Sequence, residues 1–446
     1  MLPKLNLKTT VMNQFLKNLL VSNKVLTSLV IGSLLTVNTP QLAQAKLEDS
    51  PKIVVDEVWQ IVNNEYVDKD FNHVDWLHLR QELLERDYSS PEEAYRTIRE
   101  TLKQLGDPYT RFLEPQEFES LTNQTSGEIT GIGITIEIDS QSKELVVVEP
   151  VRNSPAEAAG IQPGDRLRRI DGKNTILMSI EQASEAIRGE IGTDVELEIY
   201  REGEGVKQIT VTRAQIELPS LTYNVKQEGN TLIGYIKLNE FSSHAAEQMK
   251  EAIENLSDAG VTGFVLDLRG NPGGLLYASV DIARLWLEEG MIVKTLDQPQ
   301  TCSNPEPECG YTEIFANGTA ITDLPLVILV DGYSASASEI LAGALQENGR
   351  ATLVGTRTFG KGTVQSVHTL SDGSGLAVTI SRYYPPSGTN INKKGINPDI
   401  PVELTRTEEL VISNDPSLLA TQADPQYLKA IGFLTSSDTP QTSLTP

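Results

Sequence analysis

The chain has 446 residues, more than one compact domain usually holds, and predicts two or three domains with room for real cores. Its 61 Asp and Glu residues outnumber its 37 Lys and Arg residues, which gives a formal net charge of -24. Because so acidic a surface repels phosphate backbones and anionic headgroups, we expect neither nucleic acid nor an anionic membrane as a partner.

The first 45 residues predict a secretory signal peptide. They contain four lysines and no acidic residue, then the apolar run Val25–Val37 and the small-residue site Ala43-Gln44-Ala45. A membrane span needs roughly 20 apolar residues, so this run is short for one, and an uncleaved anchor is the alternative. We expect export, a mature chain that begins near Lys46, and no stable membrane span after cleavage.

Two modules follow. Residues 46–115 repeat apolar positions at helical spacing until Gly106-Asp107-Pro108, and predict an N-terminal helical module. Residues 116–213 contain short alternating runs separated by turns, and one helix near Ser179–Ile187. The second stretch therefore predicts a compact β-rich domain.

Residues 214–412 predict an α/β core with at least partly parallel strand pairing, because strands and helices alternate along them. The expected elements are strands at Leu232–Leu238, Gly263–Leu268, Leu326–Val330 and Ala351–Gly355, and helices at Ala245–Asn255, Leu276–Trp286 and Ser338–Gln346. Residues 413–446 predict a short helix and a Ser/Thr/Pro tail, which we expect to be disordered from about Thr435. The chain is thus expected to be an α/β multidomain protein.

Cys302 and Cys309 are the only cysteines, and no histidine lies near them in the sequence. A zinc site would need more ligands, so we expect no metal and no cofactor. In an oxidising compartment the pair forms either a local disulfide or two free thiols, and neither cysteine is a catalytic candidate.

Ser336 is the candidate nucleophile, because it lies between a predicted strand and a predicted helix. Its spacing to Glu339 is that of a capping box, so capping the helix is the structural alternative. The two roles are compatible, since the same position places the amide of Ala337 at the positive end of the helix dipole, where an oxyanion would be stabilised. Ser334 and Ser338 are poorer candidates.

Lys361 is the candidate base, and glycines flank it on both sides. A lysine serves as a base only when neutral, so burial must lower its pKa from about 10.4 to near 7. If the following residues are extended, Gln365 shares a face with Lys361 while His368 points the other way, which makes His368 a poor partner for Ser336.

The stretch Gly355–Lys361 also fits the first part of a phosphate-binding P-loop. Gly362 stands where such a loop needs Ser or Thr, and Thr363–Leu370 alternates like a strand where a helix should begin. Both features count against a nucleotide site.

The turn Asp267–Gly274 follows an apolar strand and opens a helix, so its glycines are explained by backbone geometry alone. Exposed amides of Gly273 or Gly274 could also supply the second oxyanion donor, beside that of Ala337.

Four motifs together closely resemble the carboxyl-terminal processing proteases, also called tail-specific proteases. The resemblance covers about residues 51–434 and rests on Ser336–Glu339, Phe359–Gln365, Asp267–Gly274 and Gly106–Leu113. It implies an α/β protease core that acts as a Ser/Lys endopeptidase on the C-terminal tails of proteins.

The resemblance also implies roles for individual residues. Ser336 would be the nucleophile, Lys361 the general base and Gln365 a residue that orients the lysine. Some descriptions of the family add an aspartate to a charge-relay set; this chain has Glu347 at that position, which puts that role in doubt.

The β-rich domain then resembles a PDZ domain. Its carboxylate-binding loop would be Gly131-Ile132-Gly133-Ile134, whose backbone amides could hold the terminal carboxylate of a peptide that adds a strand to the sheet edge. A glycine-rich hairpin is the structural alternative for that loop.

The helical segment resembles the cyanobacterial and chloroplast branch of the family, which implies a periplasmic or thylakoid-lumen location. One member of that branch trims a photosystem II reaction-centre precursor, so such a precursor is a candidate substrate among other flexible-tailed proteins. The alternative function is a non-catalytic adaptor that binds protein C-termini through its PDZ-like domain.

Overall fold

The computed structural model describes residues 50–296 and 310–435. The predicted signal peptide, both cysteines and the Ser/Thr/Pro tail beyond Thr435 lie outside these ranges. Within them, no helix combines the length and apolar character needed to cross a bilayer.

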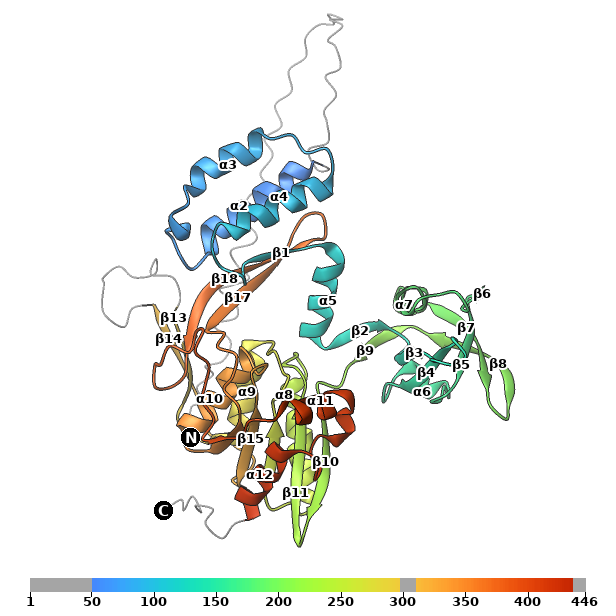
Figure 1. Cartoon of the computed structure of the whole chain (residues 1–446). Helices are drawn as coiled ribbons and strands as arrows, with labels where there is room; N and C mark the ends of the chain where they lie inside the picture. The colour runs from blue at the N-terminus through green and yellow to red at the C-terminus, as the bar shows by residue number, and fades with distance from the viewer. Residues whose placement is uncertain (1–49, 297–309, 436–446) are drawn as a thin grey trace, which may run out of the picture. The chain divides into compact units, whose positions relative to one another are not determined.

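The N-terminal module is helical, as its periodicity predicts, and the three groups of apolar positions fall on α2, α3 and α4 (Figure 1). Side chains at the helix starts accept backbone hydrogen bonds: Ser50 from Lys52, Asp75 from His78 and Ser90 from Glu93. The elements are α2 (Pro51–Glu65), η2 (Phe71–His73), α3 (Trp76–Glu85), α4 (Pro91–Lys103), β1 (Arg111–Leu113) and α5 (Pro115–Ser126).

The β-rich prediction is confirmed by a sheet in the order β3-β4-β5-β7-β8, with β6 paired to β5. A separate two-stranded ribbon of β2 (Glu128–Gly131) and β9 (Ala214–Glu217) carries both ends of this domain. The remaining elements are β3 (Ile134–Ile138), β4 (Leu145–Pro150), α6 (Pro155–Ala158), β5 (Arg166–Ile170), β6 (Lys173–Asn174), α7 (Ile180–Ile187), β7 (Asp194–Arg201) and β8 (Gly205–Thr212).

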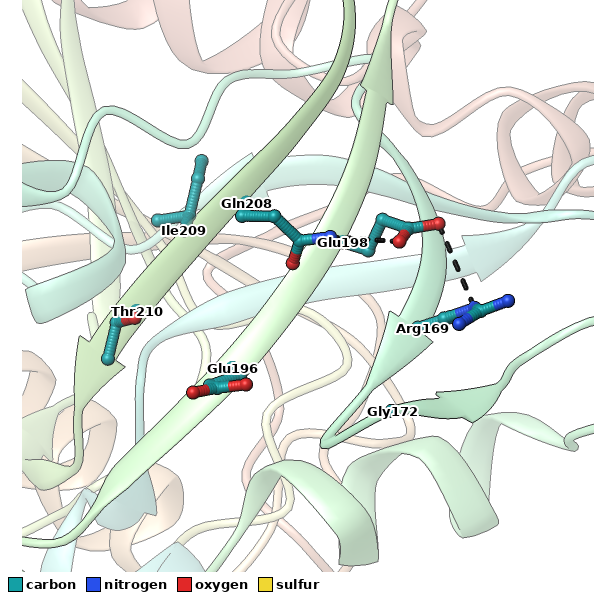
Figure 2. A pocket seen from close by; sticks show the side chains of 7 residues that line it. All are labelled: Arg169, Gly172, Glu196, Glu198, Gln208, Ile209 and Thr210. Atoms are coloured by element: carbon teal, nitrogen blue, oxygen red, sulfur yellow. Dashed lines mark hydrogen bonds and ion pairs between the residues drawn. The ribbon is translucent and has the colours of Figure 1, made fainter.

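A hollow lies on this sheet over β5, β7 and β8 (Figure 2). Its walls are polar: Gln208 donates to Glu198 at 2.8 Å, and Arg169 approaches the same carboxylate at 3.9 Å. None of the predicted site residues lines it, so it contributes nothing to the predicted chemistry.

The core contains a sheet in the order β10-β11-β12-β15-β16-β19. The pairs from β11 to β19 are parallel and β10 is antiparallel, as alternating strands and helices predict. All seven predicted elements are present: β11 (Thr231–Leu238), α8 (Ala245–Asp258), β12 (Phe264–Asp267), α9 (Leu276–Trp286), β15 (Leu326–Val330), α10 (Ala337–Glu347) and β16 (Ala351–Gly355). β12 is one residue shorter at each end than predicted, and β10 (Leu221–Glu228) and β19 (Ile400–Pro401) form the two edges of the sheet.

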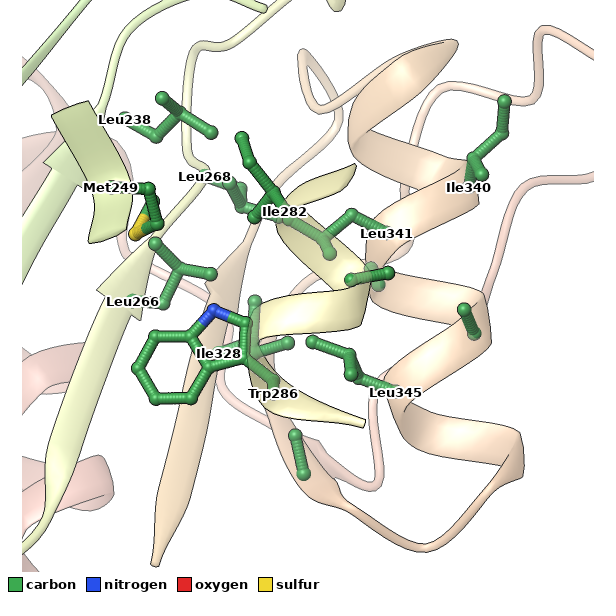
Figure 3. Close-up of a cluster of buried hydrophobic side chains, with 14 of the residues drawn as sticks. Leu238, Met249, Leu266, Leu268, Ile282, Trp286, Ile328, Ile340, Leu341 and Leu345 are labelled. Atoms are coloured by element: carbon green, nitrogen blue, oxygen red, sulfur yellow. The ribbon is translucent and has the colours of Figure 1, made fainter. Parts of the chain in front are cut away.

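Successive residues of each strand point to opposite faces of this sheet, and helices cover both faces, so the side chains on each side are buried. On one face, Leu266 and Ile328 pack with Trp286 of α9 and Leu341 of α10 (Figure 3). On the other, Val265 and its neighbours pack against the C-terminal helix α12 (Pro425–Thr435). This three-layer arrangement explains the continuous apolar runs of the central strands.

A second sheet, which the sequence analysis did not predict, joins distant parts of the chain. Its order is β1-β18-β13-β14, with β17 paired to β18. β1 thereby adds residues of the N-terminal module to strands of the core (Figure 1). The elements are β13 (Met291–Leu296), β14 (Tyr311–Phe315), β17 (Thr363–Thr369) and β18 (Gly375–Tyr384), and α11 (Arg406–Asn414) and η4 (Pro416–Leu418) precede α12.

Candidate active site

Ser336 lies at the turn from β15 into α10, directly before the first residue of the helix. Its backbone has φ 55° and ψ -114°, a combination that residues with a side chain rarely adopt. Such strain persists where the surrounding structure enforces it, and it clusters at active sites. Ser334 and Ser338, the poorer candidates, are buried, and their hydroxyls donate to the carbonyls of Leu268 and Asn271, both at 2.9 Å.

The fully buried carboxylate of Glu339 connects the predicted nucleophile with the predicted base. It accepts backbone hydrogen bonds from Ser336 at 3.0 Å, Lys361 at 2.8 Å and Gly360 at 2.7 Å, and one from the Thr358 hydroxyl at 2.6 Å. Burial raises the pKa of Glu339, and these hydrogen bonds oppose the increase. One side chain thus fixes the start of α10 against the loop that carries Lys361.

A second link comes from the buried side chain of Tyr383 in β18. Its hydroxyl is within hydrogen-bond reach of the Ser336 carbonyl, at 3.1 Å, and of the Lys361 carbonyl. Within the described residues no hydrogen bond joins the Ser336 hydroxyl directly to the Lys361 amine. The two candidate groups are held in one site through their backbones.

The Lys361 side chain lies in a pocket that favours its neutral form. Burial, followed by the charge of Arg111, lowers the pKa of Lys361 to about 8, while the charges of Asp107 and Glu339 oppose the decrease. The amine lies 4.9 Å from the ring centroid of Tyr109. At neutral pH a fraction of this lysine is therefore available to accept a proton.

Two of the predicted oxyanion donors, Ala337 and Gly273, lie beside Ser336. A Cβ added to Gly273 would lie 2.8 Å from the Ser336 Cβ and 3.0 Å from the Ala337 nitrogen, which shows how closely the two loops approach. As the first residue of α10, Ala337 has an amide without an acceptor in its own helix.

The two glycines differ in their amides. Gly273 donates to the Asn271 side chain at 2.9 Å, whereas no hydrogen bond among the described residues uses the amide of Gly274. Of the two, Gly274 is the better candidate for the second donor.

Gln365 lies in β17, and its amide donates to the hydroxyls of Thr363 at 3.0 Å and Thr379 at 3.3 Å. Within the described residues it makes no hydrogen bond to Lys361, so the expected direct orientation of the lysine is not seen here. A register shift between Val364 and Gln365 also breaks the simple alternation assumed from the sequence. His368 nevertheless faces elsewhere, since its ring bonds to Glu65 of α2 at 2.8 Å.

The charge-relay candidate Glu347 requires a correction. It ends α10, which begins just after Ser336, and 11 helical residues span about 16 Å. Its carboxylate is exposed and accepts hydrogen bonds from the Ser387 amide at 2.6 Å and hydroxyl at 2.9 Å. Glu347 therefore closes a surface loop and lies too far from Ser336 to relay charge.

The nucleotide alternative is also excluded. A P-loop requires a helix after its lysine, and the chain instead forms strand β17 from Thr363. Within residues 50–296 and 310–435, no group of three or more His, Cys, Asp or Glu side chains could hold a metal ion.

The loop Gly131-Ile132-Gly133-Ile134 leads from β2 into β3, the edge strand of the β-rich sheet. Ile132 is buried, and Gly133 has φ 79° with its carbonyl accepting from the Val151 amide at 2.9 Å. This geometry leaves β3 with an open edge next to the loop, as strand addition requires.

Sequence reasoning missed three residues of the site: Tyr109, Thr358 and Tyr383. Thr358 precedes Lys361 by three positions and could have been suspected, because motif neighbours often support a site. Tyr109 lies in the Gly106–Leu113 motif, but no local pattern shows that this segment pairs with the core. Nothing in the sequence distinguishes Tyr383 from other strand tyrosines.

Two family models match parts of this chain, and known proteins resemble most of its length. Peptidase family S41 matches residues 232–402, and the PDZ domain matches residues 146–201. A carboxyl-terminal-processing protease from a Synechocystis species is 42% identical over 412 residues, covering 92% of each chain. Carboxyl-terminal-processing peptidase 2 of Arabidopsis thaliana chloroplasts is 37% identical, covering 85% of this chain and 74% of its own.

Among solved structures, a photosystem II D1 C-terminal processing protease is 34% identical, with a TM-score of 0.50, and the match covers 88% of this chain and 99% of that one. The protein is therefore a serine peptidase with a PDZ domain. It belongs to the carboxyl-terminal-processing proteases of peptidase family S41.

Proposed function

We propose that this protein is an exported Ser/Lys endopeptidase that processes the C-terminal tails of protein substrates. The observation that carries the proposal is the Glu339 carboxylate, which binds the backbone of Ser336 and of Lys361 at once. A nucleophile and base held by one buried group keep their geometry without a histidine.

In the proposed reaction, the Ser336 hydroxyl attacks the scissile carbonyl while neutral Lys361 accepts its proton. The amides of Ala337 and Gly274 stabilise the oxyanion, with Gly273 as the alternative second donor. Lys361 then returns the proton to the leaving amine, and water hydrolyses the acyl-enzyme with Lys361 acting as base again. Gln365 contributes indirectly, because its hydrogen bonds to Thr363 of β17 and Thr379 of β18 hold these two strands together beside the lysine.

The PDZ domain is proposed to select the substrate. The amides of the Gly131–Ile134 loop bind its terminal carboxylate, while the peptide pairs with β3. One solved relative is a photosystem II D1 C-terminal processing protease. This likeness supports a photosystem II reaction-centre precursor with a flexible C-terminal tail as the substrate, and a thylakoid lumen or periplasm as the location.

Intact-mass analysis of a flexible-tailed test protein, incubated with the mature enzyme, tests the proposal. We expect cleavage by the wild type and none by Ser336→Ala or Lys361→Ala. Continued cleavage by Lys361→Ala would remove the lysine as the essential base. Binding of C-terminal peptides without any cleavage by the wild type would favour the adaptor function instead.

A further inference from the structure

The segment Gly106–Leu113 has no role in the reaction as proposed above, although it is one of the motifs that define the chain. It precedes the PDZ domain in the sequence, yet β1 pairs with β18 through Arg111 opposite Ala377 and Leu113 opposite Gly375. The segment is thereby part of the sheet that also holds β17, the strand that follows Lys361.

Side-chain hydrogen bonds fix this segment in place. Asp107 accepts from the Tyr109 amide at 3.0 Å and from the Thr110 hydroxyl at 2.7 Å. The Thr110 oxygen in turn accepts from the amide of Thr379 at 3.0 Å, and the Thr379 hydroxyl accepts from Gln365 at 3.3 Å. The segment that bears Tyr109 is thus connected through Thr379 to β17.

The result is an aromatic ring over the amine of Lys361, with 4.9 Å between the nitrogen and the ring centroid. A cation within about 6 Å of such a ring is attracted to its face, and the attraction grows when water is excluded. Burial raises the pKa of Tyr109, so its phenol stays neutral and does not compete as a base.

We propose that Tyr109 is a positioning residue for the base: the face of its ring holds the Lys361 amine in the pocket from which it serves Ser336. This inference rests on the proposed Ser/Lys mechanism. It assigns part of the active site to a segment that lies before the PDZ domain in the sequence.

Several charged or titratable groups surround the amine, and they define what the ring adds. Arg111 and Asp107 come from the segment itself, Glu339 from α10, and Tyr383 from β18 at the lysine carbonyl. The ring favours the ammonium form, whereas burial and Arg111 favour the neutral amine. Removing the ring should therefore lower the pKa of Lys361, and a ring with stronger cation attraction should raise it.

The test measures kcat and KM against pH for three variants of the mature enzyme. Tyr109→Phe keeps the ring and should stay within about twofold of wild type. Tyr109→Leu fills the space without a ring, so kcat should fall about tenfold with little change in KM, and the acid limb should move about half a pH unit lower. Tyr109→Trp, with the strongest ring attraction, should move the limb to higher pH.

Thermal unfolding of each variant shows whether the fold is intact. Wild-type kcat and an unmoved acid limb in Tyr109→Leu would overturn the inference, as would equal losses in Tyr109→Phe and Tyr109→Leu. If Tyr109→Leu does not fold, the comparison of Tyr109→Trp with Tyr109→Phe decides, and coincident pH profiles would overturn the inference.

Lys361→Ala, measured in parallel, separates this inference from the proposed function. An active Lys361→Ala variant would remove the basis of both. An inactive one beside a normal Tyr109→Leu variant would overturn only the role of the ring.

Discussion

At the scale of single residues, the neighbours of Ser336 and Lys361 set the properties of the site. Burial and the charge of Arg111 lower the pKa of the Lys361 amine to about 8, so a fraction of it is neutral at pH 7 and able to accept a proton. Glu339 accepts four hydrogen bonds, of which two come from the backbone of Ser336 and of Lys361. Both effects predict measurable behaviour.

The first prediction concerns the pH dependence of cleavage. Only the neutral lysine accepts a proton, so kcat/KM should rise with pH through an apparent pKa near 8 and level off above about pH 9. A profile measured in a buffer series of constant ionic strength checks this. A midpoint near 6.5, the ordinary range of histidine, would argue against Lys361.

The second prediction concerns Glu339→Gln. The amide keeps the volume but loses the negative charge and replaces one acceptor oxygen with a donor, leaving backbone N–H groups of the site without a partner. We expect kcat to fall about a hundredfold and the free energy of unfolding to fall by about 1–3 kcal/mol. Cleavage assays and denaturant unfolding measure both, and Glu347→Gln, at the far end of α10, is the control expected to cleave normally.

At the scale of elements, the site lies where two turns meet, each at the carboxyl end of a buried parallel strand. The carbonyl of Asn271, after β12, accepts from the Ala335 amide at 3.1 Å and from the Ser338 hydroxyl at 2.9 Å. Only a glycine fits at position 273, because an added Cβ would lie 2.8 Å from the Ala335 carbonyl oxygen. Gly273 therefore allows the turn after β12 to approach the turn after β15, in addition to adopting a positive φ.

The third prediction compares two glycines of this turn. Gly273→Ala should abolish most cleavage, about a hundredfold or more, because the methyl group pushes the turn away from Ser336. Gly270→Ala is the matched control: its φ is 73° but nothing lies within 4 Å of its added Cβ. It should cost about 1–2 kcal/mol of stability from backbone strain and leave kcat unchanged. Equal activities of the two variants would contradict the packing argument.

At the scale of the whole molecule, a buried ionic network joins the C-terminal helix region to the core. Arg269, in the turn after β12, donates to Asp267 at 2.6 Å and to Asp424, just before α12, at 2.8 Å. Burial alone would raise the pKa of Asp267, but the charges of Arg269 and Lys237 hold it well below its ordinary value. The ionised carboxylate is thus stabilised by the fold.

The fourth prediction follows from the sign of that shift. A carboxyl whose pKa is lower in the folded state adds stability above its unfolded pKa of about 3.9, and that stability is lost as the pH falls below this value. The free energy of unfolding should therefore drop steeply below about pH 4. Asp267→Asn should be less stable than wild type at pH 7 and should lose less stability on acidification; parallel acid-unfolding curves for the two proteins would contradict this.

The central α/β elements were predictable from the sequence because their signal is local: continuous apolar runs such as Leu326–Val330 and helical periodicity in α9 and α10. The second sheet was not, since the pairing of Arg111 with Ala377 depends on contacts between distant segments that no window of sequence contains. The candidate residues Ser336 and Lys361 could be named because each lies in a local sequence motif. Tyr383 could not, because its role depends on contacts with these two distant residues. The irregularity before Gln365 shows that strict alternation fails where a strand bulges.

The pairing of β1 with β18 has a consequence for how the enzyme is made. A chain synthesised from its N-terminus presents Tyr109 early, but Lys361 and Tyr383 only after most of the polypeptide exists. Before β17 and β18 have formed, Tyr109 lacks the Lys361 and Tyr383 that complete the pocket of the base. A chain truncated before these strands therefore carries no complete peptidase site. The topology thereby withholds proteolytic activity from the nascent chain until nearly the whole polypeptide has been synthesised and folded.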